Sequence, residues 1–167
     1  MQRTVLCSIP RSWRAHKTLL AFSLSLFALT ACGADSNRLW GSAVKDYGGL
    51  PFDEVQIQYQ EIGGKLDAMK VIYVQSPNVA NERQEQVKVI GQAPFVEGQP
   101  NDLKVGGSVT RTVRDNSFFP KLKEGNITFS KLGKPGETAE GEFHATFEGG
   151  RTVNGEFSAT VVKISAK

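Results

Sequence analysis

Apolar and polar residues alternate along most of the chain after residue 54, and this alternation predicts β-strands. Val55, Ile57 and Tyr59 alternate with glutamines, which is typical of a strand with one buried and one solvated face. Residues 67–75 are apolar at both parities, so we expect a more central strand there. The same patterns predict further strands at residues 86–92, 104–114, 126–132, 139–147 and 151–164.

Glycine-rich and proline-rich turns separate the predicted strands, at residues 63–64, 76–78, 98–101, 134–136 and 149–150. No segment of this region has a helical period of useful length. Short connections favour pairing between neighbours in the chain. We therefore predict an all-β fold, an antiparallel meander of about seven or eight strands that forms a small barrel or a sandwich.

The last two predicted strands repeat one another. GEFHATF at residues 141–147 returns as GEFSATV at residues 155–161. The apolar residues of both copies have odd numbers, so they share one face only if the numbers of opposing residues sum to an even value. This requires a loop of odd length, and we expect three residues with a glycine in the left-handed conformation.

A basic region and an apolar run precede the alternating part of the chain. Residues 18–31, TLLAFSLSLFALTA, are 14 residues without a charge. A bilayer-spanning helix needs about 20 apolar residues, so this run fits a cleavable signal helix. The run ends in Leu29-Thr30-Ala31-Cys32, which resembles the lipobox of bacterial lipoproteins, a branched apolar residue and two small residues before a cysteine.

The lipobox resemblance implies lipidation of the Cys32 thiol by a diacylglyceryl group, cleavage between Ala31 and Cys32, and acylation of the new amino group. The divisions that we predict are a signal peptide at 1–31, a short tether at 32–38 and one β domain at 39–167. The alternatives are an ordinary signal peptide cut nearby, for example after Ala34, and an uncleaved anchor. Gly33 and Ala34 follow the cysteine with no aspartate next to it, which resembles the outer-membrane sorting pattern of enteric bacteria.

Removal of the signal peptide changes the charge and the cysteine content. Four of the 20 basic residues precede Cys32, which leaves 16 bases against 17 acids and a net charge of −1. The basic character of the whole chain is therefore no argument for a nucleic-acid partner. Cys7 is lost as well, so Cys32 has no disulfide partner in the mature chain, and lipidation accounts for a lone cysteine in an exported protein.

The C-terminal repeat resembles the motif GxFxAxFxxGRxLxGxF of uncharacterised β-rich bacterial lipoproteins. The match covers residues 141–157, with Val153 where leucine is more usual. The resemblance implies a β-rich fold and no particular activity.

The residue types of the mature chain disfavour catalysis and metal binding. His144 shares the even-numbered, outward face with Glu156 and Ser158, but a catalytic triad needs a buried carboxylate and an oxyanion pocket that an open strand face does not provide. One histidine without a free cysteine cannot supply a zinc site. We expect no cofactor and no metal.

Arg111, Phe118 and Phe119 are candidates for a binding surface, and Trp40 is a separate candidate for contact with lipid. Arg111 shares parity with apolar neighbours, and we expect a strand near the rim whose guanidinium reaches water, with a ligand-facing arginine as the alternative. Phe118 and Phe119 could form an exposed binding tip. We expect instead that one of the pair fills the end of the core. Trp40 either packs in the core, as we expect, or contacts lipid headgroups.

These observations lead to three functional hypotheses. The first is a lipid-anchored, non-enzymatic envelope protein of the outer membrane, with a binding or structural role beside another envelope protein. The second is a carrier of a small apolar ligand in a lipocalin-like barrel. The third is a hydrolase, which requires His144 in a pocket with a nucleophile.

Overall fold

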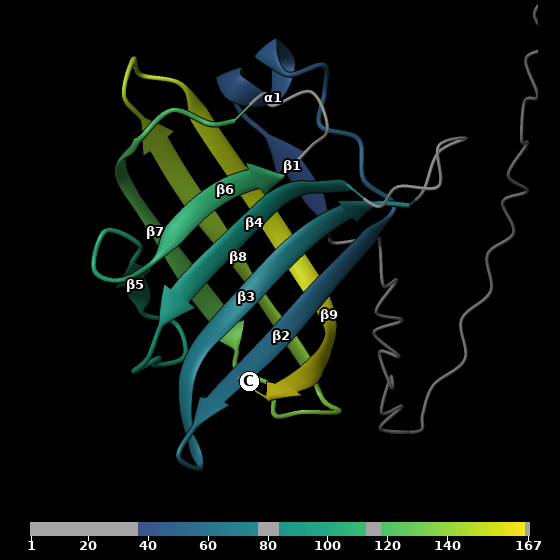
Figure 1. The fold of residues 1–167 in the computed structure, drawn as a ribbon, viewed down its shortest axis with the longest axis vertical. Helices are drawn as coiled ribbons and strands as arrows, with labels where there is room; N and C mark the ends of the chain where they lie inside the picture. Colours follow the sequence, from purple (N-terminus) through teal and green to yellow (C-terminus); the bar gives the residue numbers. More distant parts are fainter. Residues whose placement is uncertain (1–36, 77–83, 113–117, 166–167) are drawn as a thin grey trace, which may run out of the picture. The chain divides into compact units, whose positions relative to one another are not determined.

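The computed structural model describes residues 37–76, 84–112 and 118–165, and they form one strongly curled sheet with a single short helix (Figure 1). The predicted signal helix, Ala31 and Cys32 lie outside the described residues. The elements are β1 Arg38–Trp40, α1 Ser42–Asp46, β2 Glu54–Ile62, β3 Lys65–Gln75, β4 Gln84–Gln92, β5 Pro100–Asp102, β6 Ser108–Thr112, β7 Leu122–Lys131, β8 Thr138–Phe147 and β9 Thr152–Ser165.

The strands lie in the order β5-β7-β8-β9-β2-β3-β4-β6, and β1 pairs with β9 beside β2. The prediction of a β-rich fold is confirmed, but the prediction of an antiparallel meander is wrong in one respect, because β2 and β9 are parallel. The sheet is a half-barrel: in the part of the chain that the structure describes, no ladder joins β5 to β6. β5 still contacts β4, the strand next to β6, since the Asn101 side chain on β5 donates to the Gln92 carbonyl over 2.9 Å.

The length of β9 is the reason for the mixed topology. One edge of this 14-residue strand pairs with β8 from Thr152 to Thr160. The other edge is divided, because antiparallel β1 takes residues 154–156 and parallel β2 takes residues 161–165. α1 reverses the chain between β1 and β2, so these two strands run in opposite directions along the same edge.

The β8–β9 hairpin confirms the register predicted from the repeat. Ala145 faces Val153 and Phe143 faces Gly155, and each pair of numbers has an even sum. The backbone N–H of Phe147 donates to the carbonyl of Arg151 over 2.8 Å, which leaves a loop of three residues, 148–150. Gly149 and Gly150 have φ angles of 91° and 81°, a conformation that glycine adopts without the steric cost of a side chain.

Each glycine of the repeat faces a phenylalanine of the other copy. Gly141 lies between Phe129 on β7 and Phe157 on β9, and the two rings meet edge to face with centroids 5.3 Å apart. A Cβ atom at Gly141 would lie 2.7 Å from Phe157 and 2.1 Å from the Thr128 carbonyl oxygen. The glycines are therefore required where aromatic rings cross the neighbouring strand.

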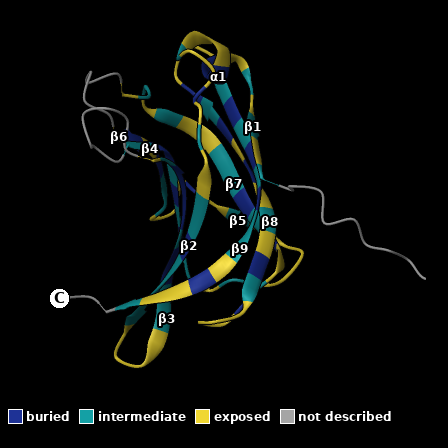
Figure 2. Cartoon of the chain, turned by 90° about the vertical axis from the view of Figure 1, so that its right-hand side faces the viewer, coloured by how far each residue is buried: buried dark blue, intermediate teal, exposed yellow. Residues whose placement is uncertain are grey.

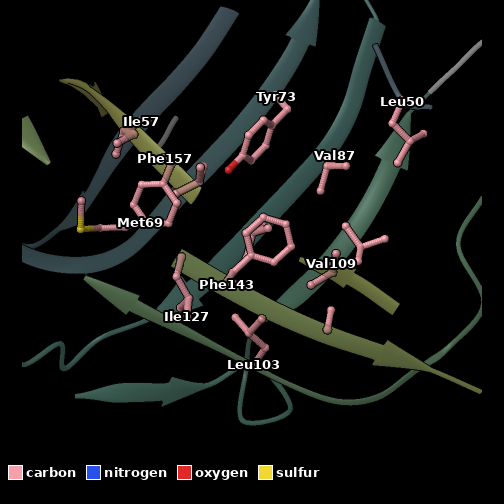
Figure 3. Packing of buried hydrophobic residues seen from close by; sticks show 14 of the residues in the cluster. Leu50, Ile57, Met69, Tyr73, Val87, Leu103, Val109, Ile127, Phe143 and Phe157 are labelled. Carbon is pink, nitrogen blue, oxygen red and sulfur yellow. The ribbon is translucent and has the colours of Figure 1, made fainter. Parts of the chain in front are cut away.

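The inner face of the curled sheet holds a continuous apolar core (Figure 3). β2, β3, β4 and β6 supply one wall, and β7, β8 and β9 supply the other (Figure 1). Tyr73 is fully buried between the walls, with its ring 5.0 Å from Phe52 and 6.0 Å from Phe143. Burial alternates along β8 and β9, which agrees with one buried and one solvated face (Figure 2).

Gly141→Ala tests the packing of rings over glycine. We expect a loss of about 1–3 kcal/mol in the free energy of unfolding, because the added methyl group overlaps the Thr128 carbonyl and the Phe157 ring. Urea unfolding gives the change. Glu142→Ala, at the exposed neighbouring position, serves as the control and should change stability by less than about 0.5 kcal/mol; equal effects of both substitutions would contradict this account.

Candidate functional site

Arg111 lies inside one end of the half-barrel, under α1. The sequence-based expectation that its guanidinium reaches water is wrong, since the residue is only 8% exposed. The guanidinium lies 5.1 Å from the ring centroid of Tyr47, which follows α1, and its Nη2 donates to Oε1 of the buried Gln86 over 3.4 Å. α1 and the segment after it cover this end of the sheet, which the strand pattern alone did not predict.

Phe119 and Phe118 have different environments. Phe119 stacks on Phe147 of β8 with ring centroids 4.9 Å apart and meets Tyr47 edge to face at 5.4 Å. The prediction that one of the pair fills the end of the core is thus confirmed for Phe119. Phe118 is 57% exposed, and its carbonyl accepts a hydrogen bond from the Tyr47 hydroxyl over 2.9 Å. Arg111 and Phe119 therefore contribute to core closure at this end, and Phe118 alone of the three is at the surface.

Side chains bond the divided edge of β9 at the end of the β1 pairing and in the interval between β1 and β2. The Asn37 side-chain amide accepts from the Ser158 N–H over 2.6 Å and donates to the Ser158 carbonyl over 3.2 Å, as a neighbouring strand would. The Tyr73 hydroxyl donates to the Glu156 carbonyl over 2.7 Å. Burial raises the pKa of Tyr73, with a smaller contribution from the Glu156 carboxylate, so the hydroxyl stays protonated and remains a donor.

Tyr73→Phe isolates the contribution of this hydroxyl. We expect the free energy of unfolding to fall by about 1 kcal/mol, because the ring remains and one buried hydrogen bond is lost. Thermal and urea unfolding measure the change. Tyr59→Phe, on the neighbouring β2 where the tyrosine is half-buried, is the matched control with an expected change below about 0.5 kcal/mol. An unchanged Tyr73→Phe variant would count against the hydroxyl's role.

The outer face of β1, β9, β8, β7 and β5 holds a straight row of polar and aromatic residues. Directly opposed residues of paired strands present their side chains on the same face of the sheet. The strand register places five residues in this row, namely Trp40, Asn154, His144, Asn126 and Asp102. Trp40 is 41% exposed, so the expectation that it packs in the core is wrong.

His144 has two neutral partners on the outer face. Its Nδ1 contacts the Asn154 Oδ1 atom, and its Nε2 lies 3.3 Å from the Thr146 hydroxyl oxygen. Ser158 and Glu156 lie on the same outer face, but neither is among these two partners of the imidazole. Glu156 is hydrogen-bonded to Arg38 instead.

Arg38 links this row to the neighbouring row on the same face, which contains Arg38, Glu156 and Glu142. Its Nε and Nη2 atoms donate to the two carboxylate oxygens of Glu156 over 2.8 and 2.6 Å. The same guanidinium lies 5.0 Å from the Trp40 ring centroid, a distance at which cation–π attraction operates. The hydrogen bonds from Arg38 lower the pKa of Glu156, partly opposed by desolvation.

Three open hollows follow this face. One of about 230 Å³ is bounded by Trp40, His144 and Asn126, and one of about 370 Å³ extends from His144 and Asn126 to Asp102. A third, of about 260 Å³, lies beside them around Glu142 and Glu156. The first two hollows share His144 and Asn126 in their linings, and the first and third share Glu142, so the three lie side by side on this face. We call these adjoining hollows together the outer-face groove.

Arg38→Gln tests the Arg38–Glu156 pair through pH. The pKa of Glu156 should rise in the variant, and ¹³C NMR titration of the carboxyl measures it. Because the pKa of Glu156 is lower in the folded state, the ionised carboxylate stabilises the fold at pH values above its unfolded-state pKa of about 4.3. This stabilisation disappears as the pH falls through the pKa of the folded state. The wild-type advantage should therefore be present near neutral pH and lost in acid. Lys163→Gln, which removes the partner of Glu61 instead, should leave the Glu156 titration unchanged.

Other ligand classes find less support among the described residues. Within them, no group of three or more histidine, cysteine, aspartate or glutamate side chains is placed to hold a metal ion. The described helix, α1, is too short to cross a bilayer, and no other described segment is a candidate helical span. No protein-family model, curated protein or solved structure matches this chain.

Proposed function

We propose that this chain is a lipid-anchored, non-enzymatic binding domain of the bacterial cell envelope, held at the outer membrane through acyl chains on Cys32. The observation that carries the proposal is the lipobox-like Leu29-Thr30-Ala31-Cys32 sequence at the end of an apolar run. One acyl chain alone binds a membrane only marginally, whereas several give a stable anchor.

The attachment of Asn37 to β9 supports a domain held close to the bilayer. Asn37 is bonded to Ser158 through its side chain, and β1 begins at Arg38, at the end of the predicted tether. Four residues lie between Cys32 and Asn37, and the five extended steps from one to the other span at most about 18 Å. A lipidated Cys32 would therefore keep the β domain near the membrane surface.

The side-chain environments support a binding role on the surface. The His144 imidazole has Asn154 and Thr146 as partners, and Glu156 is paired with Arg38. Neither arrangement resembles a nucleophile with its base and orienting carboxylate. Ring-to-ring contacts of about 5 to 6 Å cross the inner face, which favours a packed core over the lined cavity that an apolar-ligand carrier needs.

Cys32→Ser tests the anchor. Cells that express the full chain are fed a fatty-acid analogue, and we expect the wild-type protein to carry the label and to fractionate with outer membranes. The Cys32→Ser variant should be unlabelled and released from the membrane fraction. Cys7→Ser is the matched control, because Cys7 lies in the predicted signal peptide, and it should retain the label. An unlabelled wild-type protein would overturn the proposal.

A further inference from the structure

We infer that the outer-face groove binds a neutral glycan chain, which deepens the proposed function by giving the binding role a ligand class. The juxtaposition that carries the inference is the cross-strand row of an exposed tryptophan, two amides, an imidazole and a carboxylate along two adjoining hollows. The groove does not involve Cys32, so glycan binding can be tested separately from lipidation.

The dimensions of the groove suit an extended ligand. The row from Trp40 to Asp102 crosses five adjacent strands, and four interstrand spacings of about 4.8 Å give a length of about 19 Å. Several sugar rings of an extended chain fit along such a length. The hollows open to solvent along the whole row, whereas a site for a compact small molecule encloses most of its ligand.

The side-chain chemistry of the row matches a polyhydroxylated ligand. Sugar hydroxyls both donate and accept hydrogen bonds, and Asn126 offers a planar amide with both capacities. The Asn154 amide is held by its own contacts, since Oδ1 meets His144 and Nδ2 donates to the Trp40 carbonyl over 3.5 Å. Asp102 accepts from hydroxyls at one end of the row. Trp40, at the other end, presents an indole whose flat apolar surface suits the C–H face of a sugar ring.

The charges around the groove disfavour anionic partners. The acidic residues that line its three hollows are Asp102, Glu124, Glu140, Glu142 and Glu156. Against them stand Lys104 in the lining and Arg38, which is already paired with Glu156. An excess of carboxylates repels phosphate, nucleic acid and anionic headgroups, so the exposed Trp40 is better suited to a neutral ligand than to an anionic lipid surface.

Trp40 also supplies a direct measurement. The chain has two tryptophans, and Trp13 lies in the predicted signal peptide, so Trp40 would be the sole indole fluorophore of the mature protein. The mature lipidated protein, purified in detergent, is titrated with cellohexaose and with the hexamer of N-acetylglucosamine. We expect a saturable change in Trp40 fluorescence and a matching isotherm by calorimetry.

Two substitutions test the residues of the row by calorimetry. Trp40→Ala should weaken binding of either hexasaccharide about tenfold or more, as expected for loss of an aromatic anchor, and Trp40→Phe should weaken it less. Asn126→Ala should also weaken binding. Val162→Ala, at an exposed apolar residue of β9 that lines none of these hollows, is the control and should bind as wild type. Circular dichroism confirms that each variant is folded.

Three results would overturn the inference. The first is a folded wild-type protein that binds neither oligosaccharide. The second is oligosaccharide binding that Trp40→Ala leaves unchanged. The third is that Trp40 is required only for binding to anionic vesicles or to a cationic peptide, each titrated in parallel. Fatty-acid labelling of the same preparation separates the two proposals. A labelled protein that does not bind glycan contradicts the inference alone, and an unlabelled protein that binds it contradicts the anchor alone.

Discussion

The sheet depends on the pairing of one strand, β9, with partners along both of its edges. β2, β3, β4 and β6 form one antiparallel set, β5, β7 and β8 form another, and β9 joins them. Buried backbone groups must be hydrogen-bonded, so the interval between β1 and β2 on the divided edge cannot be left open. Asn37 bonds Ser158 in this interval, and Tyr73 bonds the Glu156 carbonyl from the core, at the end of the β1 pairing. The core, the parallel pair and the position of β1 all follow from this arrangement.

The glycine and phenylalanine positions of the repeat explain why binding is assigned to the outside of the sheet. Phe143 and Phe157 cross opposite glycines, and with Phe129 and Tyr73 they occupy the inner face. The outer face of the same strands carries the even-numbered residues, among them His144 and polar neighbours in shallow hollows. The two-residue period of the strands thus separates a packing surface from a surface of mixed hydrogen-bonding groups.

Much of the fold was predictable from the sequence because the relevant signals are local. The long strands and the odd-length β8–β9 loop follow from the two-residue period and from the parity of Phe143 and Phe157. β1 and β5 are three residues each and carry too short a pattern to be recognised. The parallel β2–β9 pair depends on partners about 100 residues apart, and no local pattern encodes that choice.

The candidate site was predictable only in fragments for the same reason. His144, Glu156 and Ser158 were assigned to one outward face, but the row also includes Trp40 and Asp102, which the two short strands bring into register. Arg111 was assigned to the inward parity of its strand, whereas its cover by Tyr47 depends on a five-residue helix far away in the sequence. Asn37 falls within the predicted tether because a single side chain that takes the place of a neighbouring strand leaves no periodic pattern in the sequence.

The central position of β9 also has a consequence for the order of folding. Every other described strand precedes β9 in the chain, yet β1, β2 and β8 all pair with it. During synthesis the two antiparallel sets lack the strand that joins them, and contacts this distant in sequence form late and slowly. The two antiparallel sets therefore cannot be joined into one sheet until β9 has been made.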